Sequence, residues 1–191
     1  LEEQVLAIRE LNSKGFMVAT SILGEDVTER AESFEAVQQY EEALGAIASQ
    51  NLNSNIHVKL THLGLNLGKE FCYNNVKRLL ETANSYGNFV RIDMEDSPTT
   101  DDTFHIFFRL NAEFENVGCV VQACLRRTAN DVQKLTAAKA NVRICKGIYI
   151  EPREIAYLGR GRIRENYAVL LEQLLTAGCY VGIATHDKWL V

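Results

Sequence analysis

The sequence predicts an α/β fold, a (β/α)8 TIM-like barrel of which about six βα units are present in the chain. Short apolar segments rich in valine and isoleucine alternate with longer amphipathic segments, and they recur roughly every 25 to 40 residues, the period of the βα unit. Polar side chains also stand near the C-terminal ends of the apolar segments, and such ends meet at one rim of a barrel. A doubly wound sheet is the alternative, but it needs a glycine-rich turn after the first strand, where only Gly24 stands.

The apolar segments are expected to be parallel strands that are buried on both faces. They run almost continuously through apolar residues instead of alternating with polar ones, which is typical of strands covered by helices. Asn141 marks a turn before one of them, and Val142 and Ile144 in that strand are β-branched. The expected strands cover residues 16–23, 56–60, 89–92 and 117–121, a segment that opens at 142, and residues 180–184.

The longer segments have the spacing of amphipathic helices. In residues 28–49, Phe34, Val37, Leu44 and Ile47 recur along one helical face. Comparable spacing predicts helices over residues 1–11, 69–86 and 163–177, and a further helix that carries Phe104, Phe107 and Phe108.

Several helix ends are expected from local signals. Pro98 with Asp101 predicts a helix start, because proline fits the first turn and a carboxylate is stabilised at the positive end of the helix dipole. Thr128 and Asp131 resemble a capping box for the next helix. Residues 159–162, which contain only glycine and arginine, are expected to form a solvated loop.

The composition is ordinary for a globular protein and disfavours some classes of partner. The 191 residues are 47% hydrophobic and 24% charged with a net charge of −5, so no nucleic acid partner is expected. No apolar run approaches the roughly 20 residues that cross a bilayer, and the acidic residues 1–4 do not resemble a signal peptide. The five cysteines include no CxxC pair, which indicates reduced, mostly buried thiols in a cytoplasmic protein.

A single domain over residues 1–191 is expected, since no low-complexity linker divides the chain. Six strand–helix units cannot close an eight-stranded barrel, however. An open parallel sheet would leave its apolar edges unpaired. We therefore expect these residues to be most of a longer barrel domain that lacks its last part.

The candidate site residues are polar residues near the C-terminal ends of five different strands. They are Lys59, Asp93, Gln122, Arg143 with Lys146, and Thr185 with His186. Because the carboxyl ends of barrel strands converge on one rim, we expect these side chains to gather around a single ligand.

Residues 142–151 form the most informative stretch. Lysine and arginine are almost never fully buried unless paired, so Arg143 and Lys146 are expected to face an anion or an electron-rich ring. Gly147 lets a backbone or a ligand approach where a Cβ would obstruct it. The alternative is that Arg143 pairs with a core carboxylate and Gly147 only makes a bend.

The motifs at these strand ends carry a resemblance to a known family. They are HVKLTHLG at 57–64, VRIDME at 90–95, VQACLRRT at 121–128, VRICKGIYIE at 142–151 and ATHD at 184–187. In this order, they resemble the bacterial proline dehydrogenases, which are flavoproteins with a distorted (β/α)8 barrel. The resemblance covers essentially the whole chain.

The resemblance implies an activity, a cofactor and a set of site residues. Family members oxidise L-proline to Δ1-pyrroline-5-carboxylate by passing a hydride from substrate C5 to flavin N5 of FAD, and a quinone of the respiratory membrane reoxidises the flavin. The resemblance also implies a cytoplasmic enzyme, and we further expect a peripheral contact with the inner face of the membrane. By resemblance, Lys59 binds the proline carboxylate, and Asp93 and Arg143 are the catalytic pair. The implied FAD contacts are Ile92, Gln122, Arg143, Lys146, Gly147, Ile148, Thr185 and His186.

Other interpretations stay open on the sequence alone. Lys59 or Lys146 could form a Schiff base in a barrel lyase of the aldolase type, and the chain could be a non-catalytic flavin-binding remnant. A metal site is the least favoured, since its candidate ligands share no ligand-type spacing. His57, His62 and His105 are expected to be structural or exposed. The Arg126–Arg127 pair follows the fourth strand, so it does not match the arginine pair that family members carry on the last barrel helix.

Overall fold

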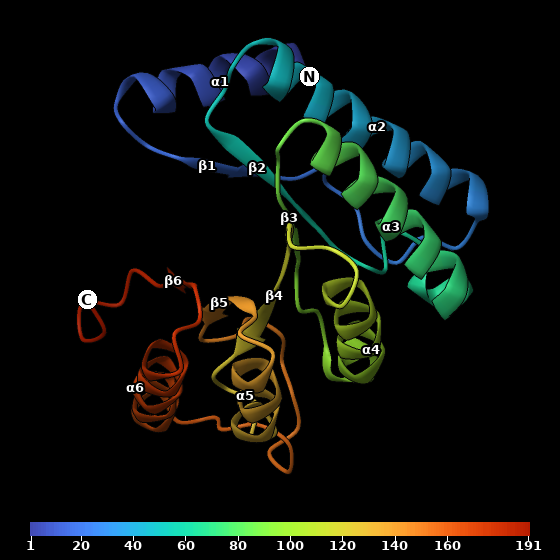
Figure 1. The fold of residues 1–191 in the computed structure, drawn as a ribbon. Helices are drawn as coiled ribbons and strands as arrows, with labels where there is room; N and C mark the ends of the chain where they lie inside the picture. Colours follow the sequence, from blue (N-terminus) through green and yellow to red (C-terminus); the bar gives the residue numbers. More distant parts are fainter. The chain divides into compact units, whose positions relative to one another are not determined.

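The computed structural model describes residues 1–191, and the chain divides into two compact units (Figure 1). The first unit comprises Leu1–Asp93 and Asp102–Val117, and the second comprises Met94–Asp101 and Gly118–Val191. Each unit is built from parallel strands that alternate with helices, so the α/β class is confirmed.

The first unit contains three parallel strands, β1 (Val18–Thr20), β2 (Ser54–Val58) and β3 (Val90–Ile92). In register, Val18 pairs with Ser54, and Val58 pairs with Ile92. The helices are α1 (Glu2–Ser13), α2 (Arg30–Ser49), α3 (Lys69–Ser85) and most of α4 (Thr100–Asn111), with a short 3-10 turn, η1 (Leu65–Leu67). The order of elements therefore follows the predicted βα rhythm.

The second unit contains the remaining strands, β4 (Val117–Gln122), β5 (Asn141–Cys145) and β6 (Val181–Ala184). Gln122 pairs with Cys145 at the C-terminal end of β4, and Cys145 pairs in turn with Ala184. The helices are α5 (Thr128–Ala137) and α6 (Arg160–Thr176), and a 3-10 turn, η2 (Ser97–Thr99), precedes α4. The C-terminal ends of these neighbouring strands therefore lie side by side.

The core of the first unit lies between its strands and α2 and α3. Ile56 and Val58 of β2 are fully buried, whereas the alternate residue His57 is only partly covered. Helix α2 buries Val37, Leu44 and Ile47 as predicted, but the prediction for Phe34 is wrong, because its side chain is 49% exposed. At that end of the helix Ser33 faces inward and accepts a hydrogen bond from Asn75 Nδ2 at 3.0 Å.

The first strand is shorter than the sequence predicts. Only Val18–Thr20 pairs with β2, and Phe16, Met17 and Leu23 from the expected strand over 16–23 are exposed. Apolar composition predicted the strand, but the extent of a strand depends on how much partner backbone is available for hydrogen bonds. Here the pairing with β2 covers three residues.

Helix α5 begins at Thr128 as predicted, but the predicted capping box is wrong. Thr128 and Asp131 do not form a capping box: Thr128 Oγ1 donates to the Gln122 carbonyl at 2.6 Å, and Asp131 Oδ2 accepts from Arg127 Nε at 2.8 Å. Both side chains are therefore bonded to other nearby groups, and neither caps the unpaired amides of the helix end.

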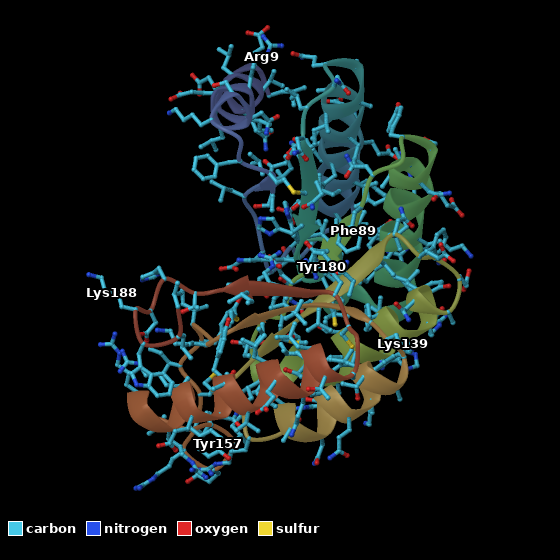
Figure 2. All side chains as sticks on the ribbon, turned by 60° about the vertical axis from the view of Figure 1, so that its left-hand side comes forward. Arg9, Phe89, Lys139, Tyr157, Tyr180 and Lys188 are labelled. Atoms are coloured by element: carbon cyan, nitrogen blue, oxygen red, sulfur yellow. The ribbon has the colours of Figure 1, made fainter.

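Residues 159–162 are not a solvated loop, since α6 already begins at Arg160. The guanidinium of Arg162 lies 5.5 Å from the ring centre of Tyr157 (labelled in Figure 2), and that of Arg126 lies 4.4 Å from the same ring. Arg162 Nη1 also donates to Glu165 Oε2 at 3.0 Å, an i,i+3 pair on the helix. These contacts extend the helix by one turn beyond the predicted start.

All five cysteines are free thiols, and none of the helices is both long and apolar enough to cross a membrane.

Candidate functional site

In the first unit, the candidate site residues are placed by the ends of two neighbouring strands. Lys59 follows the last residue of β2, and Asp93 follows the last residue of β3. The Asp93 amide donates to the Val58 carbonyl at 2.9 Å, so the ladder continues to the point where both side chains emerge. The structure therefore brings these two predicted residues together at one edge of the unit.

Lys59 pairs with a carboxylate of the loop that follows β1. Its ammonium donates to Glu25 Oε2, and both side chains remain partly exposed, at 38% and 51%. An ion pair with this exposure is weak and is readily exchanged for another anion. Lys59 is thus a cation at the mouth of the site that a ligand carboxylate can engage.

Asp93 contacts a histidine that the sequence analysis assigned to a structural or exposed role. His57 Nδ1 lies 2.6 Å from Asp93 Oδ2, and the two side chains are 23% and 18% exposed. The Tyr40 hydroxyl donates to the His57 carbonyl at 3.2 Å, and burial raises the pKa of Tyr40 to about 12, so this hydroxyl stays protonated. His57 is therefore held by a carboxylate at its ring and by a hydroxyl at its backbone.

These side chains line one small cavity of about 50 Å³. Its walls are Ser21, Ile22, Leu23, Gly24, Tyr40, His57, Lys59 and Asp93. The cavity gathers a cation, a carboxylate and an imidazole at the C-terminal ends of β2 and β3, the edge at which ligands of parallel α/β folds bind.

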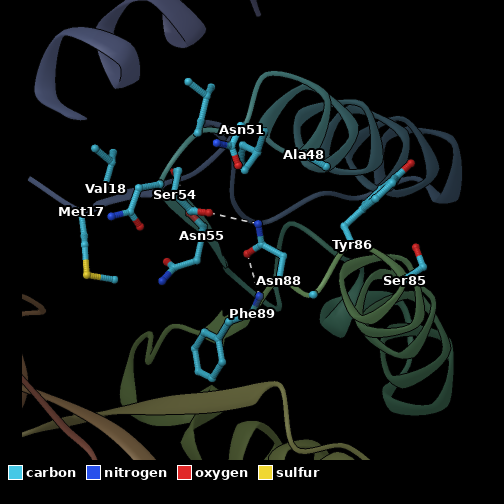
Figure 3. Close-up of a pocket in the computed structure, with 14 residues that line it drawn as sticks. Met17, Val18, Ala48, Asn51, Ser54, Asn55, Ser85, Tyr86, Asn88 and Phe89 are labelled. Carbon is cyan, nitrogen blue, oxygen red and sulfur yellow. Dashed lines mark hydrogen bonds between the residues drawn. The ribbon is translucent and has the colours of Figure 1, made fainter. Parts of the chain in front are cut away.

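A larger hollow of about 440 Å³ lies at the opposite ends of the same strands (Figure 3). It is lined by uncharged residues, among them Met17, Asn55 and Tyr86. The side-chain amide of Asn88, in the wall of this hollow, already forms hydrogen bonds within the protein. Its Nδ2 donates to the Ser54 carbonyl at 3.0 Å, and its Oδ1 accepts from the Phe89 amide at 2.6 Å. None of the predicted site residues lines this hollow.

In the second unit, Gln122 ends β4 and is buried. Its Nε2 donates to the Glu95 carbonyl at 2.7 Å, which fixes the orientation of the amide. Oε1 lies 3.0 Å from the position that a Cβ would take on Gly147. The predicted residues Gln122 and Gly147 are therefore direct neighbours.

Gly147 has a backbone conformation that favours glycine. Its φ is +103°, and a Cβ at this position would overlap the Sγ of Cys124. The Cys124 amide donates to the Lys146 carbonyl at 2.8 Å, which holds the segment after β5 against the segment after β4. Burial raises the pKa of the Cys124 thiol to about 11, so this cysteine is an uncharged packing residue.

Asp187 is the centre of the charged cluster in this unit. Its side chain is 1% exposed and accepts hydrogen bonds from Arg164 Nε at 2.9 Å and Nη2 at 2.6 Å, and from Lys146 Nζ at 2.9 Å. Arg160 Nη2 lies 3.7 Å away. The bonds from Arg164, and then those from Lys146, hold the pKa of Asp187 well below its usual range. Three cations thus surround one carboxylate, and the cluster is positively charged.

The other predicted residues of the second unit have varied surroundings. Arg143 is partly buried in β5, with its aliphatic stem beside Gly182 of β6. Thr185 Oγ1 accepts a hydrogen bond from the Asp187 amide at 3.1 Å, and His186 is exposed. Ile148 is also exposed, whereas the side chain of Ile92 in β3 of the first unit is fully buried in the core.

The sequence analysis missed the roles of His57, Tyr40 and Arg164. For His57 a signal was present, since side chains two residues apart on a strand share a face and Lys59 stands two positions later. For Tyr40 and Arg164 no local signal exists, because their partners lie 17 and 23 residues away in the chain.

Comparison with known proteins identifies the family. The family model described as proline dehydrogenase matches residues 5–188. The chain belongs to the proline dehydrogenase family. Proline dehydrogenase 2 of Bacillus subtilis is 35% identical over 184 residues, and the proline dehydrogenase of Deinococcus radiodurans is 31% identical over 196 residues. These alignments cover 96% and 100% of this chain but 61% and 63% of the two relatives, so the chain spans less than two thirds of their length.

The solved structures show the same fold. The proline utilization A protein of Bdellovibrio bacteriovorus superposes with a TM-score of 0.82 at 22% identity, over 94% of this chain and 24% of that protein. At this identity the likeness shows the fold alone: the chain provides six parallel strands of a TIM-like barrel, five of which are followed by a helix, and the predicted fold class is confirmed.

Proposed function

We propose that the protein oxidises L-proline to Δ1-pyrroline-5-carboxylate with FAD as the oxidant. Two observations support the proposal. The chain belongs to the proline dehydrogenase family, and its Lys59 and Asp93, at the ends of neighbouring strands, line the same cavity. Proline is a zwitterion with a carboxylate and an ammonium, so it requires a cation for one group and a proton acceptor for the other. The cavity supplies both.

The residues of the second unit fit FAD by their chemistry. FAD carries a diphosphate and a ring whose reduced form is electron-rich, so it calls for hydrogen-bond donors and cations. The Asp187 cluster is positively charged and includes Lys146, Gln122 offers an oriented amide, and Arg143 offers a guanidinium. We propose that Gln122, Arg143, Lys146, Gly147, Ile148, Thr185 and His186 of this unit contact FAD. For Ile92, the remaining expected contact, only the backbone is available, because its side chain is fully buried in the first unit.

When bound, FAD supplies the oxidising power, since its N5 accepts the hydride that leaves C5 of proline. Lys59 holds the proline carboxylate in exchange for Glu25. Arg143 stabilises negative charge that develops next to the reacting atom. Asp93 accepts the proton that the substrate ammonium must lose, directly or through a water, so that the nitrogen lone pair is available as the hydride departs.

The electrons are proposed to leave through a quinone of the respiratory membrane. A quinone is apolar and stays in the bilayer, so the enzyme must reach the membrane surface from the cytoplasmic side. We therefore infer a peripheral contact at the inner face of the membrane.

The test is a visible spectrum of the purified protein followed by anaerobic addition of L-proline. We expect flavin bands that bleach on addition of proline and do not bleach with D-proline. Bound flavin that keeps its colour would instead indicate a non-catalytic flavin-binding protein. A colourless protein that is trapped by borohydride with a carbonyl substrate would indicate a Schiff-base lyase.

Replacement of Lys59 by alanine is expected to raise the KM for proline by roughly 10- to 100-fold, because a charged hydrogen bond to the carboxylate is lost. The matched control is Lys69→Ala, which removes a lysine of similar exposure, 40%, from an ion pair with Asp102. Steady-state rates with an artificial electron acceptor measure both. An equal KM for proline in the two variants would show that Lys59 does not bind the substrate.

A further inference from the structure

We propose that Asp187 is a positioning residue for the cofactor: its carboxylate, bound by Arg164, holds the ammonium of Lys146 in place, so that FAD meets a cation that is already fixed. The inference rests on the proposed function and deepens it, because Lys146 is one of the residues proposed to contact FAD. Asp187 is the last residue of the ATHD motif at 184–187, whose Thr185 and His186 are also proposed FAD contacts.

Asp187 lies where the ends of two strands and the helix between them meet. Cys145 and Ala184 are register partners at the ends of β5 and β6, so the segments that follow these strands begin side by side. Lys146 opens the first segment, and Asp187 is the third residue of the second. Arg164 belongs to α6, which connects the two strands along the chain.

The hydrogen bonds to the Asp187 carboxylate are divided between its two oxygens. Oδ1 accepts from Arg164 Nη2 at 2.6 Å and from the Trp189 amide at 3.2 Å. Oδ2 accepts from Arg164 Nε at 2.9 Å and from Lys146 Nζ at 2.9 Å. Because the arginine binds both oxygens, it sets the plane of the carboxylate and with it the direction in which Oδ2 meets the lysine.

Burial gives Asp187 and Lys146 different roles. The side chain of Asp187 is 1% exposed, whereas that of Lys146 is 30% exposed. A ligand that arrives from solvent therefore reaches the lysine and not the carboxylate. An ammonium has three donors, and one of them bonds Asp187, so Lys146 can bind a ligand without leaving its carboxylate partner.

Arg164 also keeps this group of side chains positively charged. Lys146 and Asp187 alone would form a neutral pair, but with Arg164 on the same carboxylate an excess positive charge remains. Arg160 Nη2, 3.7 Å from Asp187, adds a further cation. A diphosphate or an electron-rich ring thus meets a lysine that is both charged and held in advance, and a side chain held in advance loses less freedom when the ligand binds.

The experiment measures the dissociation constant of FAD for the full chain freed of flavin, by fluorescence titration. Asp187→Asn keeps the acceptor for the Trp189 amide but places an NH2 donor where Oδ2 accepts from Lys146. We expect FAD to bind roughly 3- to 10-fold more weakly, the usual cost of ordering one long side chain on binding. Removal of a negative charge would by itself strengthen the binding of an anion, so unchanged or tighter binding would overturn the inference.

Two arginine variants on the same helix test the part played by Arg164. Arg164→Gln removes the charge that compensates Asp187, so it should also weaken the binding of FAD. Arg162→Gln is the matched control, because Arg162 pairs with Glu165 at 3.0 Å, and it should bind FAD as the wild type does. Equal dissociation constants for the two variants would contradict the role given to Arg164.

Combination with Lys146→Met separates positioning from a general loss of structure. If Asp187 acts through the lysine, Asp187→Asn should weaken the binding of FAD no further in the Lys146→Met protein. A carboxylate that only supports the fold would weaken binding in both backgrounds, so additive losses would overturn the inference. If circular dichroism shows that Asp187→Asn does not fold, Asp187→Glu, which keeps the charge and displaces the carboxylate, replaces it in the same comparison.

Bleaching of the flavin by L-proline distinguishes this inference from the proposed function. A wild-type protein that binds FAD and shows these differences, but is not bleached by proline, would overturn the proposed reaction and leave the role of Asp187 intact. A wild-type protein that is bleached by proline, but binds FAD no more tightly than Asp187→Asn, would overturn this inference alone.

Discussion

Replacement of Gly147 by alanine is expected to lower the free energy of unfolding by about 2 to 5 kcal/mol. Two costs combine: a side chain at positive φ costs roughly 1 to 2 kcal/mol, and forcing a methyl group into a packed site costs roughly 1 to 3 kcal/mol. Both apply here, because φ is +103° and the new Cβ would overlap Cys124 Sγ. Urea denaturation followed by circular dichroism measures the change.

The matched control is Gly161→Ala. Gly161 lies in the first turn of α6, and a Cβ there meets nothing within 4 Å. Alanine should therefore leave stability unchanged or raise it by up to about 1 kcal/mol. Adding Cys124→Ala to Gly147→Ala should recover the part of the loss that comes from the overlap with Sγ, whereas the part due to φ and the 3.0 Å approach to Gln122 Oε1 should remain. A Gly147→Ala protein as stable as the wild type would contradict the described conformation.

Replacement of Arg143 by alanine is expected to slow flavin reduction by roughly 10²- to 10³-fold, the usual cost of removing a group that stabilises developing charge at a reacting atom. Gln122→Ala should slow it less, because an amide carries no net charge and Gln122 already donates to the Glu95 carbonyl. Rapid-mixing measurements of bleaching by proline compare the two. Similar rates in both variants would refute the assignment of Arg143 next to the reacting atom.

Arg143→Lys is the informative conservative change. Lysine keeps the charge but loses the planar fork of donors. An intermediate rate would show that both charge and geometry contribute. Flavin content is measured in each variant, so that weaker cofactor binding is not mistaken for slower chemistry.

The strands could be predicted because each is a short apolar segment with a strong β preference. Every predicted strand overlaps one in the structure, and the residues after β2 and β3 emerge where the sequence placed them. Strand β1 was overestimated, since pairing and not apolarity sets its length. The start of α6 was predicted too late in the chain, because the guanidinium of Arg162 packs against the ring of Tyr157, a contact that composition does not reveal.

The site could be predicted only in part. Lys59 and Asp93 share a cavity, and Gln122 adjoins Gly147, as their positions at strand ends implied. The side chains that pair with residues of the site could not be predicted from the spacing of the sequence. Asp187 binds Arg164 across 23 residues, and the ring of His57 meets Asp93 across 36. Such pairs depend on which elements fold together, whereas strand ends depend on local sequence.

The assignment of substrate and cofactor residues is tested most directly by a crystal structure of the protein with FAD and an unreactive proline analogue that keeps the carboxylate. We predict that the carboxylate of the analogue lies within hydrogen-bond distance of Lys59 and that the flavin ring contacts Arg143 and Gln122. An analogue bound away from Lys59, or a flavin that touches neither Arg143 nor Gln122, would contradict the account.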